Sequence, residues 1–322
     1  MKKILALALA LCMIFALCAV TASAEADLSG LRVTCVCPFA AGGGTDRVMR
    51  FLADGAKDEF KNIVVENREG ANGDVGMLYG ATAANDGSII TMVTAELVIH
   101  QALKMNDTLT HDMFKPIMLC NTACSAITVN AADDRFETLD DFIAYSKEND
   151  VQVGNSGNGS IWQLAAAGLA QIAGTEFTHV PYPEGAAGAI TDLLGQHIDA
   201  VAVSYAEVAQ YVEAGQLKVL AVLANERQEA CPEIPTAIEL GYEGAALGTW
   251  RGLAVPASTP DDVVAELQRI FSDVCASEEF KANMALNGDV IDVLVGDDFA
   301  KMLEDQTALF TDLGNSLGLV AG

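Results

Sequence analysis

Strand-like and helix-like stretches alternate along this chain, and this order restricts its possible folds more than any other feature of the sequence. A strand-like run at 31–37 is followed by a stretch at 48–60 whose apolar residues recur at helical spacing. Further strand-like runs lie at 63–66 and 89–93, with a short helical stretch between them. This βαβαβ order predicts a parallel sheet with flanking helices.

A second series of the same kind follows downstream. Its strand-like runs lie at 126–130, 151–153, 179–182, 199–203 and 217–223, and helical stretches separate them. Two series predict two lobes, each built on a mostly parallel sheet, with a ligand cleft between them. Helix starts near 260, 277 and 299 close the chain, and we expect them to rejoin the first lobe. Lobe 1 is therefore assigned to 25–125 plus 251–322, and lobe 2 to 126–250.

The N-terminus has the pattern of an export signal. Lys2 and Lys3 precede an uncharged apolar run at 4–20, and Ala22-Ser23-Ala24 gives a small-residue cleavage site. A membrane anchor is the alternative, but the run falls short of the ~20 residues that span a bilayer. Residues 1–24 are thus predicted to be a cleaved signal peptide of an extracytoplasmic protein. Acylation at Cys18, as in a lipoprotein, is a second interpretation.

The charge balance excludes several kinds of partner. The 322 residues carry 18 Lys and Arg against 44 Asp and Glu, a formal net charge of −26. Such a chain is repelled by the phosphates of nucleic acids and by anionic lipid surfaces. Because 51% of the residues are hydrophobic and only 19% are charged, intrinsic disorder is excluded as well.

The cysteine and histidine patterns give no firm site. Beyond the leader, the chain has Cys35, Cys37, Cys120, Cys124, Cys231 and Cys275. An even number in an exported protein allows disulfides, while buried free thiols are the alternative. No CxxC pair occurs, and the four histidines lack ligand spacing, so we expect neither a metal nor a cofactor.

Sequence motifs of common enzymes are missing or broken. The sequence Gly154-Asn155-Ser156-Gly157-Asn158 fails the nucleophile elbow G-x-S-x-G at its last position. No P-loop and no complete dinucleotide-binding motif is present. We therefore expect no catalytic residues and a binding protein rather than an enzyme.

Three glycine-containing loops are candidates for holding an anion. The loops at 38–46, 156–160 and 182–186 each follow a strand and precede a helix. Unpaired backbone N–H groups and the positive end of a helix dipole point into such a region. The alternative for each loop is an ordinary tight turn, with Ser160 and Gln163 serving only as a helix cap.

The glycine loops also carry a family resemblance. Residues 38–46, Pro-Phe-Ala-Ala-Gly-Gly-Gly-Thr-Asp, resemble the opening motif of the Bug-type solute-binding receptors of tripartite tricarboxylate transporters. Val-Glu-Asn-Arg-Glu-Gly-Ala-Asn-Gly at 65–73 is similar to a second family loop. Further matching segments lie at 157–165, 179–182, 192–195, 215–222, 232–236 and 250–256, so the resemblance covers nearly the whole mature chain.

The resemblance implies a two-lobed periplasmic-binding-protein fold, of the Venus flytrap type. It implies a receptor that closes over a small carboxylate, either a di- or tricarboxylate or an amino acid, and delivers it to a membrane permease. It also implies hinges near 123–129 and 247–254, and we expect a monomer. The implied ligand-binding residues are Phe39, Ala40, Gly43, Thr45 and Asp46 in the first loop, Thr94 and Ala95 after a strand, Ser156, Gly159 and Ser160 in the second loop, and Tyr182, Gly185, Ala186 and Asp199 in the second lobe.

Three departures from the family pattern bear on the ligand. Gln163 replaces a histidine, Glu184 replaces a base, and Arg251 stands where the family often has tyrosine. If Glu184 faces the cleft, it repels a tricarboxylate or pairs with an amino group, and otherwise it is a solvated rim residue. Arg251 is a candidate partner for a carboxylate. A receptor that signals to a membrane kinase and an exported hydrolase are the alternative functions.

Overall fold

The computed structural model describes residues 26–286, 289–317 and 319–320. The predicted signal peptide, including Cys18, lies outside the described residues. The first half of the chain forms β1 (Arg32–Cys37), α2 (Gly44–Gly55), β2 (Asn62–Asn67), a short 3₁₀ turn (Ala71–Gly73), α3 (Asp74–Ala81), β3 (Ile89–Thr94), α4 (Glu96–Ala102), a second 3₁₀ turn (His111–Met113), β4 (Phe114–Asn130), α5 (Leu139–Ser146) and β5 (Gln152–Asn155). The remainder forms α6 (Ile161–Ala173), β6 (Thr178–Pro181), α7 (Ala186–Leu194), β7 (Ala200–Ser204), α8 (Tyr205–Glu213), β8 (Leu217–Leu223), β9 (Gly248–Pro256), α9 (Asp261–Ala276), α10 (Glu278–Leu286), β10 (Val290–Val295) and α11 (Asp297–Leu317).

The strands form one continuous sheet with a parallel unit toward each end. Its order is β2-β1-β3-β9-β4-β7-β5-β6, and β8 and β10 pair with β4 outside this path. Strands β2, β1 and β3 run parallel to one another, as do β6, β5 and β7. The first unit is the first series that the sequence predicts. Of the second series, three strands form the other parallel unit, whereas the strands predicted at 126–130 and 217–223 belong to β4 and β8, which pair antiparallel. The strands β4 and β9 join the two parallel units through antiparallel pairs.

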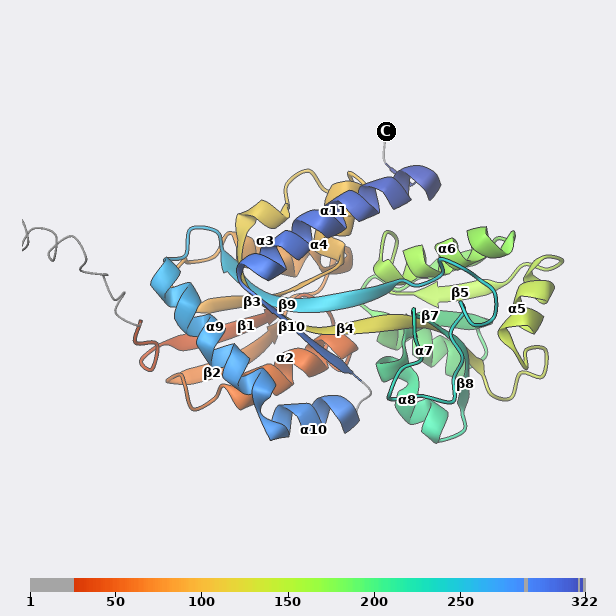
Figure 1. Ribbon diagram of the computed structural model, residues 1–322, viewed down its shortest axis with the longest axis horizontal. Helices are drawn as coiled ribbons and strands as arrows, with labels where there is room; N and C mark the ends of the chain where they lie inside the picture. The colour runs from red at the N-terminus through yellow and green to blue at the C-terminus, as the bar shows by residue number, and fades with distance from the viewer. Residues whose placement is uncertain (1–25, 287–288, 318, 321–322) are drawn as a thin grey trace, which may run out of the picture.

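Strand β4 extends through both halves of the molecule (Figure 1). Over Phe114–Cys124 it pairs with β9, and over Ser125–Asn130 it pairs with β7 and β8. Its 17 residues span about 55 Å at the usual rise per residue. The strand expected at 126–130 is thus the end of a much longer one, and β4 and β9 contain the two segments at which hinges are predicted.

Two hydrophobic clusters each support one half, and a further cluster contains residues of both halves. In the first, Val48, Met49 and Leu52 of α2 pack with Leu267 and Phe271 of α9. The helix expected near 260 therefore does return to the first half, where its apolar face is buried. In the second half, Phe136, Phe142 and Leu169 form a different cluster with the strands β5, β7 and β8. Burial of each such side chain contributes roughly 1.5–3 kcal/mol to folding.

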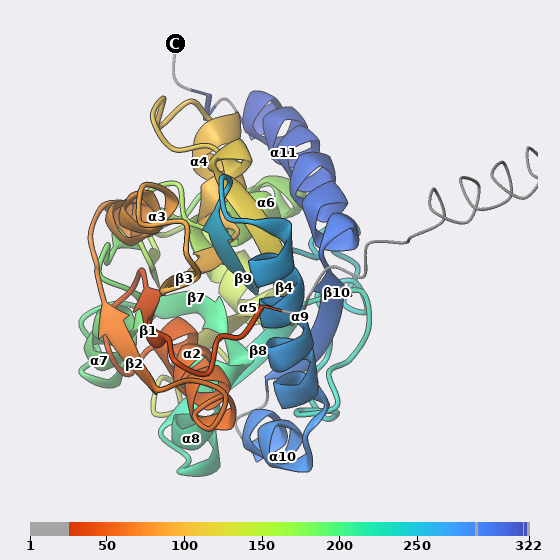
Figure 2. The same cartoon turned by 90° about the vertical axis from the view of Figure 1, so that its left-hand side faces the viewer.

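The C-terminal elements include a strand that the sequence pattern did not reveal. Strand β10 adds antiparallel to β4 and leads into α11, which lies beside α4 (Figure 2). Three of the six β10 residues are markedly exposed valines, Val290, Val293 and Val295, so no clear alternation marks the strand. Among the described residues, no helix is long and apolar enough to cross a membrane.

Candidate functional site

A pocket lies between the two halves, where the carboxyl ends of β1, β3, β5, β6 and β7 lead into loops and helices. Ligand sites of α/β folds occur at this edge of the sheet. The cavity measures about 30 Å³, which is small for a ligand pocket, so its walls lie near each other. Its lining residues are Phe39, Ala40, Gly43, Gly44, Thr45, Thr94, Glu96, Ser156, Trp162, Glu184, Gly185, Ala186, Ala187, Glu207, Thr249 and Arg251.

The loop before α2 presents the positive end of that helix to the pocket. Gly43 is the N-cap and offers no side-chain cap, so the first N–H groups of α2 have no acceptor from it. Asp46 holds the loop from behind, since it accepts hydrogen bonds from Gly42 N at 2.9 Å, from Arg50 and from Asn67. Burial alone would raise the pKa of Asp46, but these hydrogen bonds outweigh it and hold the pKa below its usual value.

Arg251 supplies the cation of the pocket. Arg251 is 2% exposed. Its Nε donates to Thr45 Oγ1 at 3.1 Å, and its Nη1 has no hydrogen-bond partner among the described residues. A Cβ on Gly44 would lie 2.9 Å from Nη2, so glycine at this position allows the guanidinium to approach the helix end. An incompletely paired buried guanidinium is costly, and a bound anion offsets that cost.

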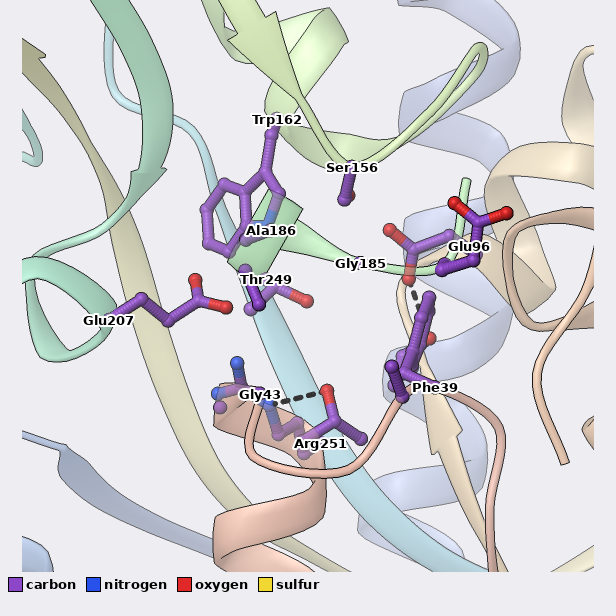
Figure 3. Close-up of a pocket in the computed structure, with 16 residues that line it drawn as sticks. Phe39, Gly43, Glu96, Ser156, Trp162, Gly185, Ala186, Glu207, Thr249 and Arg251 are labelled. Carbon is purple, nitrogen blue, oxygen red and sulfur yellow. Dashed lines mark hydrogen bonds between the residues drawn. The ribbon is translucent and has the colours of Figure 1, made fainter. Parts of the chain in front are cut away.

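The second half contributes a second helix end. Gly185, with a φ of 131°, is the N-cap of α7 and provides no side-chain cap. Ala186 and Ala187 begin this helix and line the pocket. Figure 3 shows Ser156 and Trp162 above the pocket and Arg251 below it. Donors from both halves therefore point at one region, as binding of an anion requires.

Three carboxylates line the same pocket. Glu96 is 3% exposed and accepts hydrogen bonds from Thr94 Oγ1 at 2.5 Å and from Ile161 N at 3.3 Å. Glu207 is half-buried and accepts from Ser204 N and Oγ at 3.1 and 2.8 Å. Glu184 has an exposed side chain, so its carboxylate belongs to the rim.

Hydrogen bonds join the two halves across the pocket. Ala40 N donates to Glu184 O at 3.1 Å, and Ile161 N donates to Glu96 Oε1 at 3.3 Å. The first bond links the loop before α2 to the loop before α7, and the second links the N-terminus of α6 to α4. The structure is therefore a closed arrangement of the two halves.

Eight of the fourteen predicted site residues line this pocket. They are Phe39, Ala40, Gly43, Thr45, Thr94, Ser156, Gly185 and Ala186. Five others lie close behind its wall, namely Asp46, Ala95, Gly159, Ser160 and Tyr182, and none of these five lines the cavity.

Besides Asp46, whose hydrogen bonds are given above, local contacts engage three of those five residues. Gly159 N donates to Gln163 Oε1 at 2.6 Å, and Ser160 Oγ accepts from Gln163 N at 3.1 Å, so both hold the start of α6. Tyr182 donates through its hydroxyl to Asp192 Oδ2 at 2.5 Å. Burial and this contact raise the pKa of Tyr182 to about 12. The helix-cap alternative therefore describes Ser160 and Gln163.

The structure does not place Asp199 at the pocket. Asp199 precedes β7, whereas the pocket lies beyond the other end of that strand, near Ser204. Five residues separate the two ends, about 17 Å along a strand. The Asp199 carboxylate accepts instead from Arg135 Nη2 at 2.7 Å and from Gln152 N at 2.8 Å. Its predicted site role is thus corrected to a structural one.

Several lining residues were absent from the predicted set. Glu96 follows directly after Thr94 and Ala95, so its position beyond a strand end was an available signal. Glu207 forms a capping box with Ser204, and this local role accounts for its place in the sequence, so nothing local indicated that it also lines the pocket. Thr249 precedes Arg251 by two residues on β9. Residues i and i+2 of a strand lie on the same face, so Thr249 lies on the same face as Arg251. Gly44, Trp162 and Ala187 complete the missed set, while Glu184 and Arg251 had been singled out only as departures from the family pattern.

The cysteines are resolved as free thiols. Cys35, Cys37, Cys120, Cys124, Cys231 and Cys275 form no disulfide in the structure. Burial raises the pKa of Cys35 and Cys231 to about 12, which keeps these thiols protonated. Within the described ranges, no group of three His, Cys, Asp or Glu side chains is arranged to hold a metal ion.

Comparison with known proteins identifies relatives of this chain. The model of the tripartite tricarboxylate transporter family receptor matches residues 48–319. A UPF0065 protein from the tcbD-tcbE intergenic region of Pseudomonas sp. (strain P51) is 30% identical over 252 residues, 77% of this chain and 74% of that protein.

Solved structures show the same fold. The periplasmic binding protein BugD matches with a TM-score of 0.84 and 28% identity, over 90% of this chain and 98% of that one. MatC from Rhodopseudomonas palustris, solved with bound malate, matches with a TM-score of 0.81 and 24% identity, over 88% and 98% of the two chains. These matches confirm the two-lobed α/β fold of periplasmic binding proteins. Since the family model covers most of the sequence, the chain belongs to the receptor family of the tripartite tricarboxylate transporters.

Proposed function

We propose that this protein is an extracytoplasmic receptor that captures a small carboxylate-bearing metabolite and delivers it to a tripartite-tricarboxylate-type membrane permease. Family membership supports the receptor role. The predicted signal peptide supports export, and the similar BugD is a periplasmic protein. Binding is proposed to occur without chemical conversion and without a cofactor, by a monomer.

The observation that carries this proposal is the buried Arg251. Its guanidinium lies beside the N-terminus of α2, with Nη1 unpartnered within the described part of the chain. A carboxylate accepts two parallel hydrogen bonds from a guanidinium, so a ligand carboxylate satisfies the group that the protein leaves unpaired. The shared fold of the malate-bound MatC agrees with a carboxylate ligand, but the proposal rests on this pocket.

Ligand entry is proposed to require separation of the two halves. Pockets for metabolites usually measure 300–1,000 Å³, far more than the closed cavity of about 30 Å³. The strands β4 and β9 are the proposed hinges, with the lobe boundaries near 125/126 and 250/251. Opening would break the Ala40–Glu184 backbone bond, and a bound ligand would restore bridging contacts between the lobes.

A thermal-shift screen against mono-, di- and tricarboxylates and amino acids tests the receptor role. A ligand at 100 times its dissociation constant adds about 2.7 kcal/mol to the free energy of unfolding. If no carboxylate raises the melting temperature, the proposal is wrong. Recovery of unchanged ligand after prolonged incubation, measured by NMR, checks that binding occurs without turnover. Ligand uptake by vesicles that contain the permease, with and without the receptor, tests delivery.

A further inference from the structure

The pocket carries more negative than positive side-chain charge. Glu96, Glu184 and Glu207 line it, whereas Arg251 is the single basic residue among the described residues that line it. A dicarboxylate would leave one carboxylate facing these glutamates, and like charges within ~4–6 Å of each other disfavour the charged form of both. A carboxylate-bearing ligand that also carries a positive group matches all of these side chains.

Glu207 and Arg251 lie next to each other over the same glycine. A Cβ on Gly44 would lie 2.9 Å from Arg251 Nη2 and 3.2 Å from Glu207 Cγ. Both hydrogen bonds of the Glu207 capping box end on Oε2, so Oε1 takes no part in the cap. In Figure 3 the Glu207 side chain extends into the pocket toward the Arg251 side. A guanidinium that can bind an anion and a carboxylate that can bind a cation are thus adjacent.

Glu96 offers a second acceptor on the opposite side of the pocket (Figure 3). Its two hydrogen bonds use one oxygen each, and an ionised carboxylate accepts about four. Because Glu96 is only 3% exposed, a further donor has to reach it through the pocket. Phe39 and Trp162 form apolar wall between the two acidic sides, which suits an aliphatic carbon chain.

We propose, building on the receptor function above, that the ligand is a small amino carboxylate that carries a protonated amine. Its carboxylate pairs with Arg251 at the N-terminus of α2. An amine on the neighbouring carbon donates to Glu207, and an amine at the far end of the chain donates to Glu96. The pocket therefore selects zwitterions over dicarboxylates of the same length.

Calorimetric titration at pH 7 with four matched compounds tests the selection. Butyrate has no second group, 2-aminobutyrate has an adjacent amine, 4-aminobutyrate has a terminal amine, and glutarate has a terminal carboxylate. We expect at least one amino compound to bind about tenfold or more tightly than both butyrate and glutarate. If glutarate binds more tightly than both amino compounds, the inference is wrong while the receptor function stands. If none of the four, nor any carboxylate of the thermal-shift screen, binds, both proposals are wrong.

The variant Glu207→Gln identifies the residue responsible. Glutamine also completes a capping box, so α8 keeps its start while the charge is removed. The affinity for 2-aminobutyrate should fall about tenfold, equivalent to about 1.4 kcal/mol, while that for glutarate stays constant or rises. The control is Glu213→Gln, which removes an exposed charge from the same helix and should change neither affinity.

The variant Glu96→Gln tests the carboxylate on the opposite side of the pocket. The glutamine oxygen can still accept from Ile161 N, and its amide nitrogen can donate to Thr94 Oγ1 in place of the bond that the carboxylate accepts. The affinity for 4-aminobutyrate should fall relative to that for glutarate. If both glutamate variants weaken amino compounds and glutarate equally, the glutamates only support the fold, and the inference is overturned.

Discussion

Replacement of Arg251 by methionine should have opposite effects on ligand affinity and on the stability of the ligand-free protein. Arg251 is 2% exposed, and the one hydrogen bond of its side chain within the described chain joins Nε to Thr45 Oγ1. Methionine has a similar length without the charge. Because a buried and incompletely paired guanidinium is costly, its removal should leave the free energy of unfolding unchanged or raise it by about 1 kcal/mol. The corresponding rise in melting temperature is about 2–4 °C.

Ligand affinity should fall strongly in the same variant. Hydrogen bonds between a charged donor and a carboxylate contribute roughly 1.5–3 kcal/mol each. The loss of one such bond raises the dissociation constant roughly 10- to 100-fold, and the loss of two raises it roughly 100-fold or more. Scanning calorimetry without ligand and isothermal titration with the tightest compound of the carboxylate and amino-acid screen measure the two quantities independently.

Arg47→Met is the matched control. Arg47 lies on α2 and donates from Nη2 to Asp289 Oδ2 at 2.8 Å, and the Asp289 side chain is fully buried. Loss of this arginine leaves a buried carboxylate unpaired, which should destabilise the protein by about 3 kcal/mol and leave ligand affinity unchanged. If Arg251→Met instead lowers the ligand-free melting temperature as Arg47→Met does, and affinity is unaffected, then Arg251 is structural and the reasoning is refuted.

Two further variants test the loop before α2. Gly44→Ala places a methyl group against Arg251 and Glu207. Ligand affinity should therefore fall roughly tenfold, while the free energy of unfolding changes by less than about 1 kcal/mol. Unchanged affinity in titration would contradict the assigned geometry. Asp46→Asn should cost about 2 kcal/mol at pH 7. The pKa of Asp46 is lowered in the folded protein, so the difference in free energy of unfolding is complete above the unfolded pKa of about 3.9 and shrinks as pH falls through the folded pKa. Calorimetry from pH 6 to pH 3 should therefore show the stabilities of the two proteins converging.

The fold followed from sequence where the local pattern and the tertiary arrangement agree. Both parallel units were predicted because βαβ connections impose parallel neighbours. Strand β10 was missed because its exposed face breaks the alternation. The full length of β4 was also missed, since nothing local tells a strand that serves two units from a strand that serves one.

Only part of the site could be predicted from the sequence, because some of its residues are brought together by the tertiary arrangement alone. Glycine loops at strand ends are visible in the sequence, so Gly43 and Gly185 were found. Glu207 has a complete local explanation as a capping residue, and only the fold brings it beside Gly44, more than 160 positions earlier. Asp199 shows the converse, because its site role came from the family resemblance, whereas it precedes β7 and the pocket lies beyond the other end of that strand.

The excess of acid in the pocket and the excess of acid in the whole chain act in the same direction. A net charge of −26 repels a dianion over a distance of about a Debye length, before any contact forms. A zwitterion has no net charge, so it approaches without that penalty. Inside the pocket, where water screens less than in bulk solvent, Arg251 and the helix ends attract its carboxylate, while Glu207 attracts an amine on the neighbouring carbon or Glu96 attracts an amine at the far end. The composition that excludes polyanions as partners is thus the composition expected of a receptor whose ligand pairs an anion with a cation.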